Sequence, residues 1–335
     1  MLEMRATDRY ARQSVFEGVG EAGQRRLRES RVALIGCGAL GTVLANVLAR
    51  AGVGFLRIVD RDYVELTNLQ RQVLFDEQDA RDASPKAAAA IEQLRRANSE
   101  VTYEAIIADF GPENAEQIVQ DVDVVLDGTD NLETRYVLND ICVKLGKPWV
   151  YAAAVASYGA LMPIIPGQTP CLRCVFPDQP DVGSVDTCDT TGVLGAMTGI
   201  VANMASIEAI KLLIGAHDRL NRGLTWVDCW YNLFERTPAT TPVADCPTCQ
   251  LRQFTFLDAP AWKRAVTLCG RDAVQVRPPT PVVLDLSGLA ARLRPLGDVR
   301  WSPQALRLVM PPHEMTVFRD GRAIIKGTSE LAVAR

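Results

Sequence analysis

The chain has 335 residues, of which 48% are hydrophobic and 23% charged, as in a globular protein with one large and one small domain. Its net charge of -4 and the lack of a long basic block disfavour nucleic-acid binding as the main activity. The N-terminal segment is polar and lacks the apolar core of a signal peptide, so the nine cysteines indicate a reducing, cytoplasmic location.

Predicted strands and helices alternate over roughly the first 150 residues. Buried strands are predicted at the start of RVALIGCGALG (31–41), in GFLRIVD (54–60), in VTYEAIIADF (101–110) and in DVDVVLDGTD (121–130). The helices between and after them are TVLANVLARAG (42–52), SPKAAAAIEQLRRAN (84–98) and ETRYVLNDICVKLG (133–146). This order predicts an α/β, Rossmann-like fold with a largely parallel sheet that binds ligands at the carboxyl ends of its strands.

The second half of the chain changes character. Residues 148–165 predict a strand and a hairpin, so the parallel sheet continues into antiparallel strands. Residues 192–215 are nearly long enough to span a bilayer, but they contain Asn203, Glu208 and Lys211, which favours a helix buried in a core. Residues 253–335 contain a proline cluster, short strands and a Phe-Arg-Asp-Gly-Arg hairpin turn, and we expect a small C-terminal α+β domain after a first domain over 1–252.

A glycine fingerprint follows the first predicted strand and opens a helix. It reads GCGALG, and an acid that suits a nucleotide ribose, Asp60, lies 19 residues beyond its last glycine. Glycines let backbone amides approach a phosphate closely, and a helix N-terminus adds partial positive charge. The pattern predicts a nucleotide site, without separating NAD from ATP, at Gly36, Gly38, Ala39, Gly41 and Asp60.

Polar residues suited to phosphate groups follow this fingerprint. Arg71 offers a planar fork to phosphate oxygens, Lys86 stands at a helix start, and Asp130 ends a strand where a carboxylate can approach magnesium. Hydride transfer needs none of these groups, whereas a nucleoside triphosphate needs cations and a metal. Together they favour ATP, and the further candidates around them are Asp62, Asn68, Gln70, Gln72 and Asn131.

In this order, GCGALG, DRDYVELTNLQRQ, SPK and DGTDN resemble the motifs of the ThiF/MoeB/HesA adenylyltransferases, relatives of the ubiquitin-activating enzymes. The resemblance runs from about Arg9 to Cys249. It implies an enzyme that uses ATP and Mg²⁺ to adenylate the C-terminal glycine of a ubiquitin-fold sulfur carrier ending in Gly-Gly, for thiamin, molybdopterin or a related sulfur pathway. A sulfurtransferase or cysteine desulfurase is then a possible further partner.

The same resemblance implies roles for single residues. It assigns Asp60 to the ribose, Asp130 to magnesium, and Asn68, Arg71 and Lys86 to the phosphates. Ala39 stands where relatives often have glycine, and it should fit if its backbone angles are ordinary. An arginine at the place of Arg12 reaches the ATP phosphates of a partner subunit, which implies a homodimer with composite sites.

The cysteines divide into three groups. Two C-x-x-C pairs predict a closed four-thiolate zinc site that clasps distant segments, with disulfides or no ligand as the alternatives: Cys171, Cys174, Cys246 and Cys249. Cys188 lies in a polar loop before the long apolar helix, where a helix N-terminus favours a thiolate, and the resemblance implies a covalent link to the activated carrier that is not essential in every member. Cys37, Cys142, Cys229 and Cys269 are expected to be small core residues.

Other functions remain open from sequence alone. Adenylation of a ubiquitin-like protein for protein conjugation is a close alternative. An NAD-dependent oxidoreductase is disfavoured by NLQRQ, by Lys86 and by the unremarkable settings of the two histidines, His217 and His313. A non-catalytic scaffold is disfavoured by the intact set of candidate residues. Residues 253–335 lack the cysteine loop of a rhodanese domain, and a structural, dimerising or carrier-docking role stays open for them.

Overall fold

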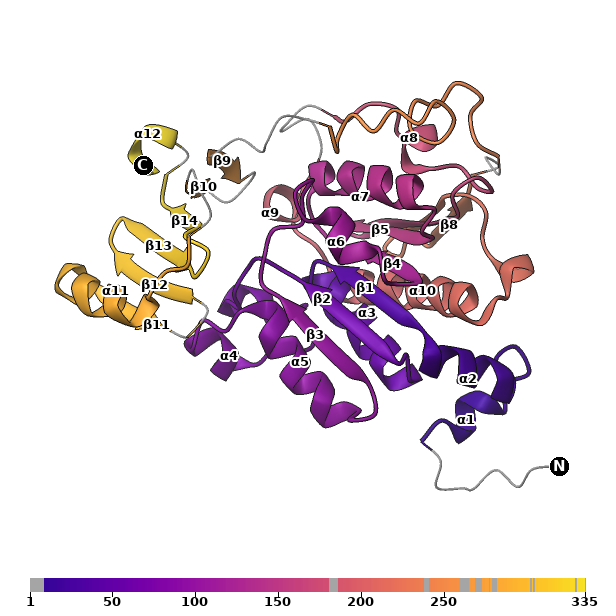
Figure 1. Cartoon of the computed structure of the whole chain (residues 1–335), viewed down its shortest axis with the longest axis horizontal. Helices are drawn as coiled ribbons and strands as arrows, with labels where there is room; N and C mark the ends of the chain where they lie inside the picture. Colours follow the sequence, from indigo (N-terminus) through magenta and orange to yellow (C-terminus); the bar gives the residue numbers. More distant parts are fainter. Residues whose placement is uncertain are drawn as a thin grey trace.

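The computed structural model describes residues 9–180, 186–237, 241–258, 265–268, 273–276, 278, 282–301, 303, 305–328 and 330–334. Within these residues the chain forms two sheets, and each belongs to a separate lobe (Figure 1). The larger lobe carries the described residues up to 258, and the smaller lobe carries the C-terminal strands.

The larger sheet has eight strands in the order β3-β2-β1-β4-β5-β6-β7-β8. The first five strands of this order pair in parallel, and the last three continue it in antiparallel fashion. This confirms the predicted parallel sheet with an antiparallel extension. The strands are β1 (Arg31–Ile35), β2 (Phe55–Val59), β3 (Thr102–Ile106), β4 (Val124–Asp127), β5 (Trp149–Val155), β6 (Tyr158–Ile164), β7 (Thr225–Asp228) and β8 (Leu233–Arg236).

Helices cover both faces of this sheet (Figure 1). One apolar core joins the sheet to α2 (Gly20–Glu29), α3 (Ala39–Ala51), α5 (Lys86–Ala97) and α10 (Gly195–Ile214). A second core on the other face contains α6 (Ala115–Val119), α7 (Leu132–Leu145) and α8 (Leu172–Val175). The remaining elements of this lobe are short: α1 (Ala11–Ser14), η1 (Leu66–Asn68), α4 (Glu77–Arg81), α9 (Cys188–Thr191) and η2 (His217–Arg219).

The helix α10 is long and apolar enough to cross a membrane by length and composition alone. In this structure 61% of its most apolar window is buried, and Met197, Val201 and Ala205 belong to the core against α3 and the sheet. Its polar Glu208 is buried and accepts hydrogen bonds from Lys211 and from the backbone of Asn221. This confirms the prediction of a core helix.

The smaller lobe is an antiparallel sheet with helix α11 on one face. Its strand order is β11-β12-β13-β14-β10-β9, and the turn at 318–322 connects β13 to β14 as predicted. Helix α11 packs its apolar side on one face of the sheet through Leu286 and Ala290. The elements are β9 (Ala265–Leu268), β10 (Ala273–Val276), α11 (Leu286–Leu293), η3 (Arg294–Leu296), β11 (Asp298–Trp301), β12 (Ala305–Met310), β13 (His313–Phe318), β14 (Ala323–Lys326) and α12 (Leu331–Ala334).

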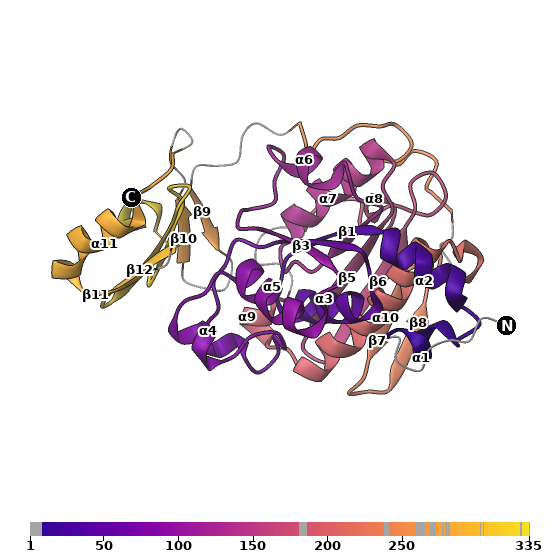
Figure 2. The same cartoon turned by 60° about the horizontal axis from the view of Figure 1, so that its bottom comes forward.

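The other face of the smaller sheet lies against the larger lobe (Figure 2). Apolar side chains of both lobes form one cluster there, with Tyr63 and Ala83 from the larger lobe packed on Ala273, Phe318 and Ile324. The Tyr63 hydroxyl also donates to the Glu314 carboxylate at 2.9 Å. The two lobes therefore share a small core next to the loop that follows β2.

Candidate functional site

Four parallel strands end at the same edge of the larger sheet. Ile35 at the end of β1 pairs with Val59 of β2 and with Asp127 of β4, and Val59 pairs with Ile106 of β3. The residues that follow these strands are therefore neighbours, and they include the glycine turn, Asp60, the segment after Ile106 and the turn at 128–131. A ligand site at this edge is the arrangement expected of an open parallel sheet.

The glycine turn is packed too tightly for side chains at two of its positions. Gly36 has a φ of +88°, and a Cβ there would lie 2.6 Å from the carbonyl oxygen of Gly128. A Cβ on Gly41 would collide with the carbonyl of Gly36. A Cβ on Gly38, which precedes α3, would instead have room, with the Gln72 amide nitrogen at an ordinary contact distance of 3.8 Å. Ala39 is the first helical residue, so the expectation that alanine fits here is met.

Asp60 is held by the backbone around it. Its carboxylate accepts hydrogen bonds from the N–H of Cys37 at 2.6 Å and from the N–H of Asp62 at 2.7 Å. Burial raises the pKa of Asp60, while the positive charge of Lys86 opposes this rise. The carboxylate thus links the glycine turn to the loop after β2, and it lies at the edge where the fingerprint predicts a ribose.

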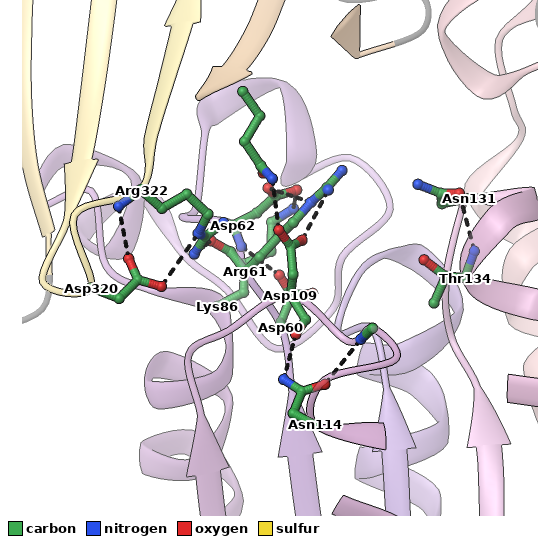
Figure 3. Close-up of polar contacts among 12 residues, drawn as sticks. Asp60, Arg61, Asp62, Lys86, Asp109, Asn114, Asn131, Thr134, Asp320 and Arg322 are labelled. Atoms are coloured by element: carbon green, nitrogen blue, oxygen red, sulfur yellow. Dashed lines mark hydrogen bonds and ion pairs between the residues drawn. The ribbon is translucent and has the colours of Figure 1, made fainter. Parts of the chain in front are cut away.

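A charged network surrounds Asp60 (Figure 3). The Lys86 ammonium lies 3.3 Å from the Asp62 carboxylate, and Lys86 is only 4% exposed. Arg61 donates to Asp109 at 3.0 Å and lies 3.7 Å from Asp62. Burial alone would lower the pKa of Arg61, but the carboxylates of Asp109, Asp62 and Asp130 outweigh it and raise the pKa. Asp130 is therefore close enough to this network to act on its charge.

Arg61 and Asp109 were not among the predicted site residues. Both come directly after strands β2 and β3, and both are charged, which is the signal that could have identified them. Asp109 belongs to none of the motifs quoted above, and Arg61 lies inside DRDYVELTNLQRQ without a role assigned to it.

The segment after Asp62 presents Asn68 in a fixed orientation. The Asn68 side-chain oxygen accepts from the Glu65 N–H at 3.0 Å, while the Glu65 carboxylate accepts from the Asn68 N–H in a reciprocal cap of η1. Since the oxygen of the Asn68 amide is engaged, its NH₂ group is the end available for an anionic acceptor. Arg71 donates to the Thr67 carbonyl at 2.9 Å and is partly exposed.

The two glutamines of this segment have different environments. Gln70 has an exposed side chain, and its backbone carbonyl faces Gly195 at the start of α10. Gln72 is 4% exposed, faces Gly38, and its side-chain oxygen has no hydrogen-bond partner among the described residues. By position, Gln72 is therefore the better candidate for contact with a ligand over the glycine turn.

The turn after β4 contains one structural and one exposed acid. Asp127 is fully buried and accepts from the Thr129 backbone, the Thr129 hydroxyl and, at 2.9 Å, the Arg135 guanidinium. These bonds fix the turn that carries Asp130, which is exposed. Asn131 caps α7 by accepting from the Thr134 N–H at 3.3 Å (Figure 3).

Cys188 also lies at this edge of the sheet. It is the first residue of the four-residue helix α9, separate from α10, and its sulfur donates to the Ala154 carbonyl of β5 at 3.4 Å. Because β5 runs parallel to β4, Ala154 is near the same ends of the strands as Asp130.

Arg12 does not join this site within one chain. Its exposed side chain belongs to α1, and its neighbour Arg9 donates to the Ala97 carbonyl and pairs with Glu100 just before β3 begins. That is the amino edge of the sheet, opposite the site.

The predicted zinc ligands come together. The four sulfur atoms lie within 4.8 Å of one another, and the Cys171–Cys246 and Cys174–Cys249 sulfur distances are both 3.5 Å. Thiolates about 2.3 Å from one zinc ion in a tetrahedron would be roughly 3.8 Å apart, so the cluster fits this metal. Cys171 directly precedes α8 and Cys174 lies within it, whereas Cys246 and Cys249 come after β8 in the chain. The cluster therefore joins the segment after β8 to the second core of the larger lobe.

The other cysteines agree only in part with the prediction of core residues. Cys37 and Cys142 are buried, and burial raises the pKa of both thiols. Cys229 is exposed after β7, so the prediction that it is a core residue was wrong. The hairpin of β7 and β8 places residues 229–236 on the surface. Cys269 lies outside the described residues.

The chain is similar to known proteins over most of its length. The sequence model of the ThiF family matches residues 10–248. The chain is 41% identical over 331 residues to the sulfur carrier protein ThiS adenylyltransferase of Bacillus subtilis (strain 168), covering 98% of this chain and 97% of the relative. It is 40% identical over 248 residues to the SAMP-activating enzyme E1 of Haloferax volcanii, covering 74% and 90%.

The fold also matches solved structures. The crystal structure of E. coli MccB + MccA-N7isoASN superposes with a TM-score of 0.64 at 21% identity, covering 72% of this chain and 75% of that chain. At this identity the match shows the fold alone.

Proposed function

This chain belongs to the ThiF family, and from that premise we propose that it adenylates the C-terminal glycine of a ubiquitin-fold sulfur-carrier protein. The match to the Bacillus subtilis ThiS adenylyltransferase over nearly the whole of both chains supports this activity. The observation that carries the proposal is the site itself. Its glycine turn admits no side chain at Gly36, the charge of Lys86 acts on Cys37 and Asp60 beside that turn, and Asp130 follows the Gly128 that contacts Gly36.

In the proposed reaction, a carboxylate oxygen of the carrier's C-terminal glycine attacks the α-phosphorus of ATP. A new P–O bond forms, the bond from the α-phosphorus to the bridging oxygen breaks, and pyrophosphate leaves with the electron pair. The protein needs no nucleophile for this step. Its contribution is to position the phosphates and to stabilise the negative charge that moves onto pyrophosphate. Lys86, Arg71 and the Asn68 amide would supply that stabilisation.

We assign a magnesium ion to Asp130. A carboxylate oxygen is the ligand type that Mg²⁺ takes, and a metal ion from solvent can reach the exposed Asp130 but not the fully buried Asp127. Magnesium would neutralise charge on the phosphate oxygens. Arg61 and Arg135 are both near enough to Asp130 for its negative charge to contribute to their raised pKa.

The test of the proposed function is carrier-dependent exchange of labelled pyrophosphate into ATP. Purified enzyme, Mg·ATP and a ubiquitin-fold carrier ending in Gly-Gly should give exchange, and the same carrier without its last glycine should give none. If no carrier supports exchange while another acid substrate does, the proposal is wrong. Transfer of sulfur to the adenylated carrier, by a sulfurtransferase or a cysteine desulfurase, would be the following step.

The cysteine cluster leads to a prediction about metal content. Four thiolates with no open position should bind about one zinc ion per chain, and binding should contribute folding free energy. We expect the Cys174→Ser variant to lose zinc, unfold at a lower temperature and dissolve poorly, as measured by elemental analysis and thermal unfolding. The exposed Cys229 lies outside the cluster, so Cys229→Ser should keep both zinc and stability. If wild-type protein that was purified under reducing conditions contains no bound metal, the zinc assignment is wrong.

A second prediction concerns Cys188. We propose that its thiol takes up the carrier from the acyl-adenylate, with the C–S bond replacing the C–O bond and AMP leaving. Cys188→Ala should then keep pyrophosphate exchange but lose a covalent carrier adduct that thiol reagents release, as seen on non-reducing gels. Cys229→Ala controls for adducts at an exposed cysteine. An adduct that survives in the Cys188→Ala variant would exclude this role.

A further inference from the structure

The smaller lobe lies directly against the segment that carries the phosphate-binding side chains. The ThiF family match ends at residue 248, so it assigns no role to these C-terminal strands. The match to the Bacillus subtilis ThiS adenylyltransferase, in contrast, covers 98% of the chain and so includes most of them. Polar contacts between the two lobes converge on the residues that follow β2 and β3, and two of these connections lead to the proposed ATP site.

The first connection runs from β14 to Asn68. The Lys326 ammonium pairs with the Glu65 carboxylate, and it lies 4.0 Å from Glu314 and 5.4 Å from the centre of the Tyr63 ring. Glu65 in turn caps η1 and exchanges hydrogen bonds with Asn68. Less than a third of each side chain, Lys326 and Glu65, is exposed. The smaller lobe thus fixes the residue that orients the Asn68 amide.

The second connection runs from β10 to Lys86, and Figure 3 shows the part that involves Asp109, Arg61, Asp62 and Lys86. The Gln275 amide donates to one oxygen of Asp109 at 2.7 Å, and the other oxygen accepts from Arg61 at 3.0 Å. Arg61 then lies beside Asp62, which pairs with Lys86. Arg322, 2% exposed, adds a hydrogen bond from its guanidinium to the Arg61 carbonyl at 3.1 Å.

Both connections start from a rigid base. The apolar cluster shared by the lobes buries Tyr63, and Glu314 on β13 accepts from Tyr63 and, at 2.6 Å, from Arg307 on β12. Side chains packed between two sheets in this way lose little further freedom when a ligand binds. The smaller lobe therefore holds the loop from Arg61 to Asn68 in place before ATP binds.

We propose that the C-terminal sheet is a positioning domain for the ATP site, and that Lys326 and Gln275 are positioning residues that pre-organise Asn68 and Lys86 for the phosphates. The inference rests on the proposed adenylation and names residues outside the part of the chain that the family match covers. Its consequence is specific. When only a fraction of molecules has a competent site, apparent affinity falls by that fraction, while turnover at saturating ligand is unchanged.

The experiment compares Lys326→Met with wild type in carrier-dependent pyrophosphate exchange. We expect the KM for ATP to rise about five- to tenfold, the low end of typical coupling between linked sites. The kcat and the KM for the carrier should stay within about twofold of wild type, because saturating ATP selects the competent loop. Lys326→Arg keeps a cation at this place and should restore much of the ATP affinity. Gln275→Leu should raise the KM for ATP through the second connection.

Arg300→Ala is the matched control. Arg300 is a cation of the same sheet that also contacts the larger lobe, through the Arg81 carbonyl at 3.0 Å, but this contact leads to neither Asn68 nor Lys86. An unchanged KM for ATP in both Lys326→Met and Gln275→Leu would overturn the proposal. So would a rise in the carrier KM alone, which would identify the sheet as a docking surface. A wild-type enzyme without exchange would instead refute the adenylation on which the inference rests.

Discussion

The Asp130→Ala variant is expected to lose pyrophosphate exchange by about a hundredfold or more, the scale at which a single group that stabilises developing charge acts. Asp130 is the exposed acid of the turn after β4, and it would hold the assigned magnesium ion, which would neutralise charge on the phosphates. The fold should be intact, because the turn is fixed by the buried Asp127 and by Arg135. Exchange kinetics with circular dichroism and thermal unfolding measure both expectations.

Glu113→Ala is the control for this experiment. Glu113 is exposed in the loop after β3. The substitution therefore removes one negative charge near the same edge of the sheet and leaves the turn that carries Asp130 unchanged. We expect its exchange rate to stay within about twofold of wild type, as for most surface substitutions. A well-folded Asp130→Ala enzyme with normal exchange would remove Asp130 from the mechanism and would move the magnesium assignment elsewhere.

The fold of the larger lobe was largely predictable because its signals are local. A buried strand, a glycine with positive φ and a helix follow one another within a dozen residues at 31–42, and the pattern fixes the geometry of the turn. The same holds for α5, which begins directly after Pro85, and for the hairpin turn at 318–322. Each of these features depends on residues close together in the chain.

What sequence reasoning missed depends on partners far apart in the chain. Arg61 contacts Asp109, and Asp109 contacts Gln275, 166 residues further on. No spacing rule identifies such a set, because the packing of two sheets, rather than local periodicity, brings it together. The contrast between the exposed Gln70 and the buried Gln72 is of the same kind. The turn after η1, in which the N–H groups of Arg71 and Gln72 both donate to the Asn68 carbonyl, decides which side chain faces Gly38, and such a short segment has no period that is visible in the sequence.

The C-terminal strands show how this limit bears on function. Their composition indicated only a small domain, with a structural, dimerising or docking role open. The contacts of Lys326 and Gln275 favour a role in the proposed ATP site. Lys326 pairs with Glu65, which exchanges hydrogen bonds with Asn68, and Gln275 donates to Asp109, which pairs with Arg61 beside Asp62. An interface with buried charged groups is weak evidence for stability alone, because desolvation offsets much of the attraction between ions. The charged contacts between the two lobes are better explained by the orientation that they give to the loop from Arg61 to Asn68.

Two inactive variants should restore activity when their subunits mix. We propose a homodimer in which Arg12 of one chain reaches the ATP phosphates of its partner, since Arg12 is exposed at the amino edge of the sheet, away from its own site. Val15 and Phe16, each 67% exposed beside Arg12, supply apolar surface for such an interface. Arg12→Ala and Asp130→Ala should each be inactive alone. After the subunits have mixed, about half of the dimers are heterodimers with one intact site. The rate of pyrophosphate exchange should therefore recover to about a quarter of wild type.

Arg9→Ala separates a reaching arginine from a structural one. Arg9 lies three residues before Arg12, but its guanidinium is engaged within its own chain by the Ala97 carbonyl and by Glu100. A variant at Arg9 should therefore be active alone, whereas Arg12→Ala should not. Arg12→Lys should recover little, because a planar fork binds phosphate oxygens at two points and an ammonium does not. Subunit exchange is verified with two differently tagged chains. A mixture that stays inactive after verified exchange, or a fully active monomer, would show that Arg12 does not act across the interface.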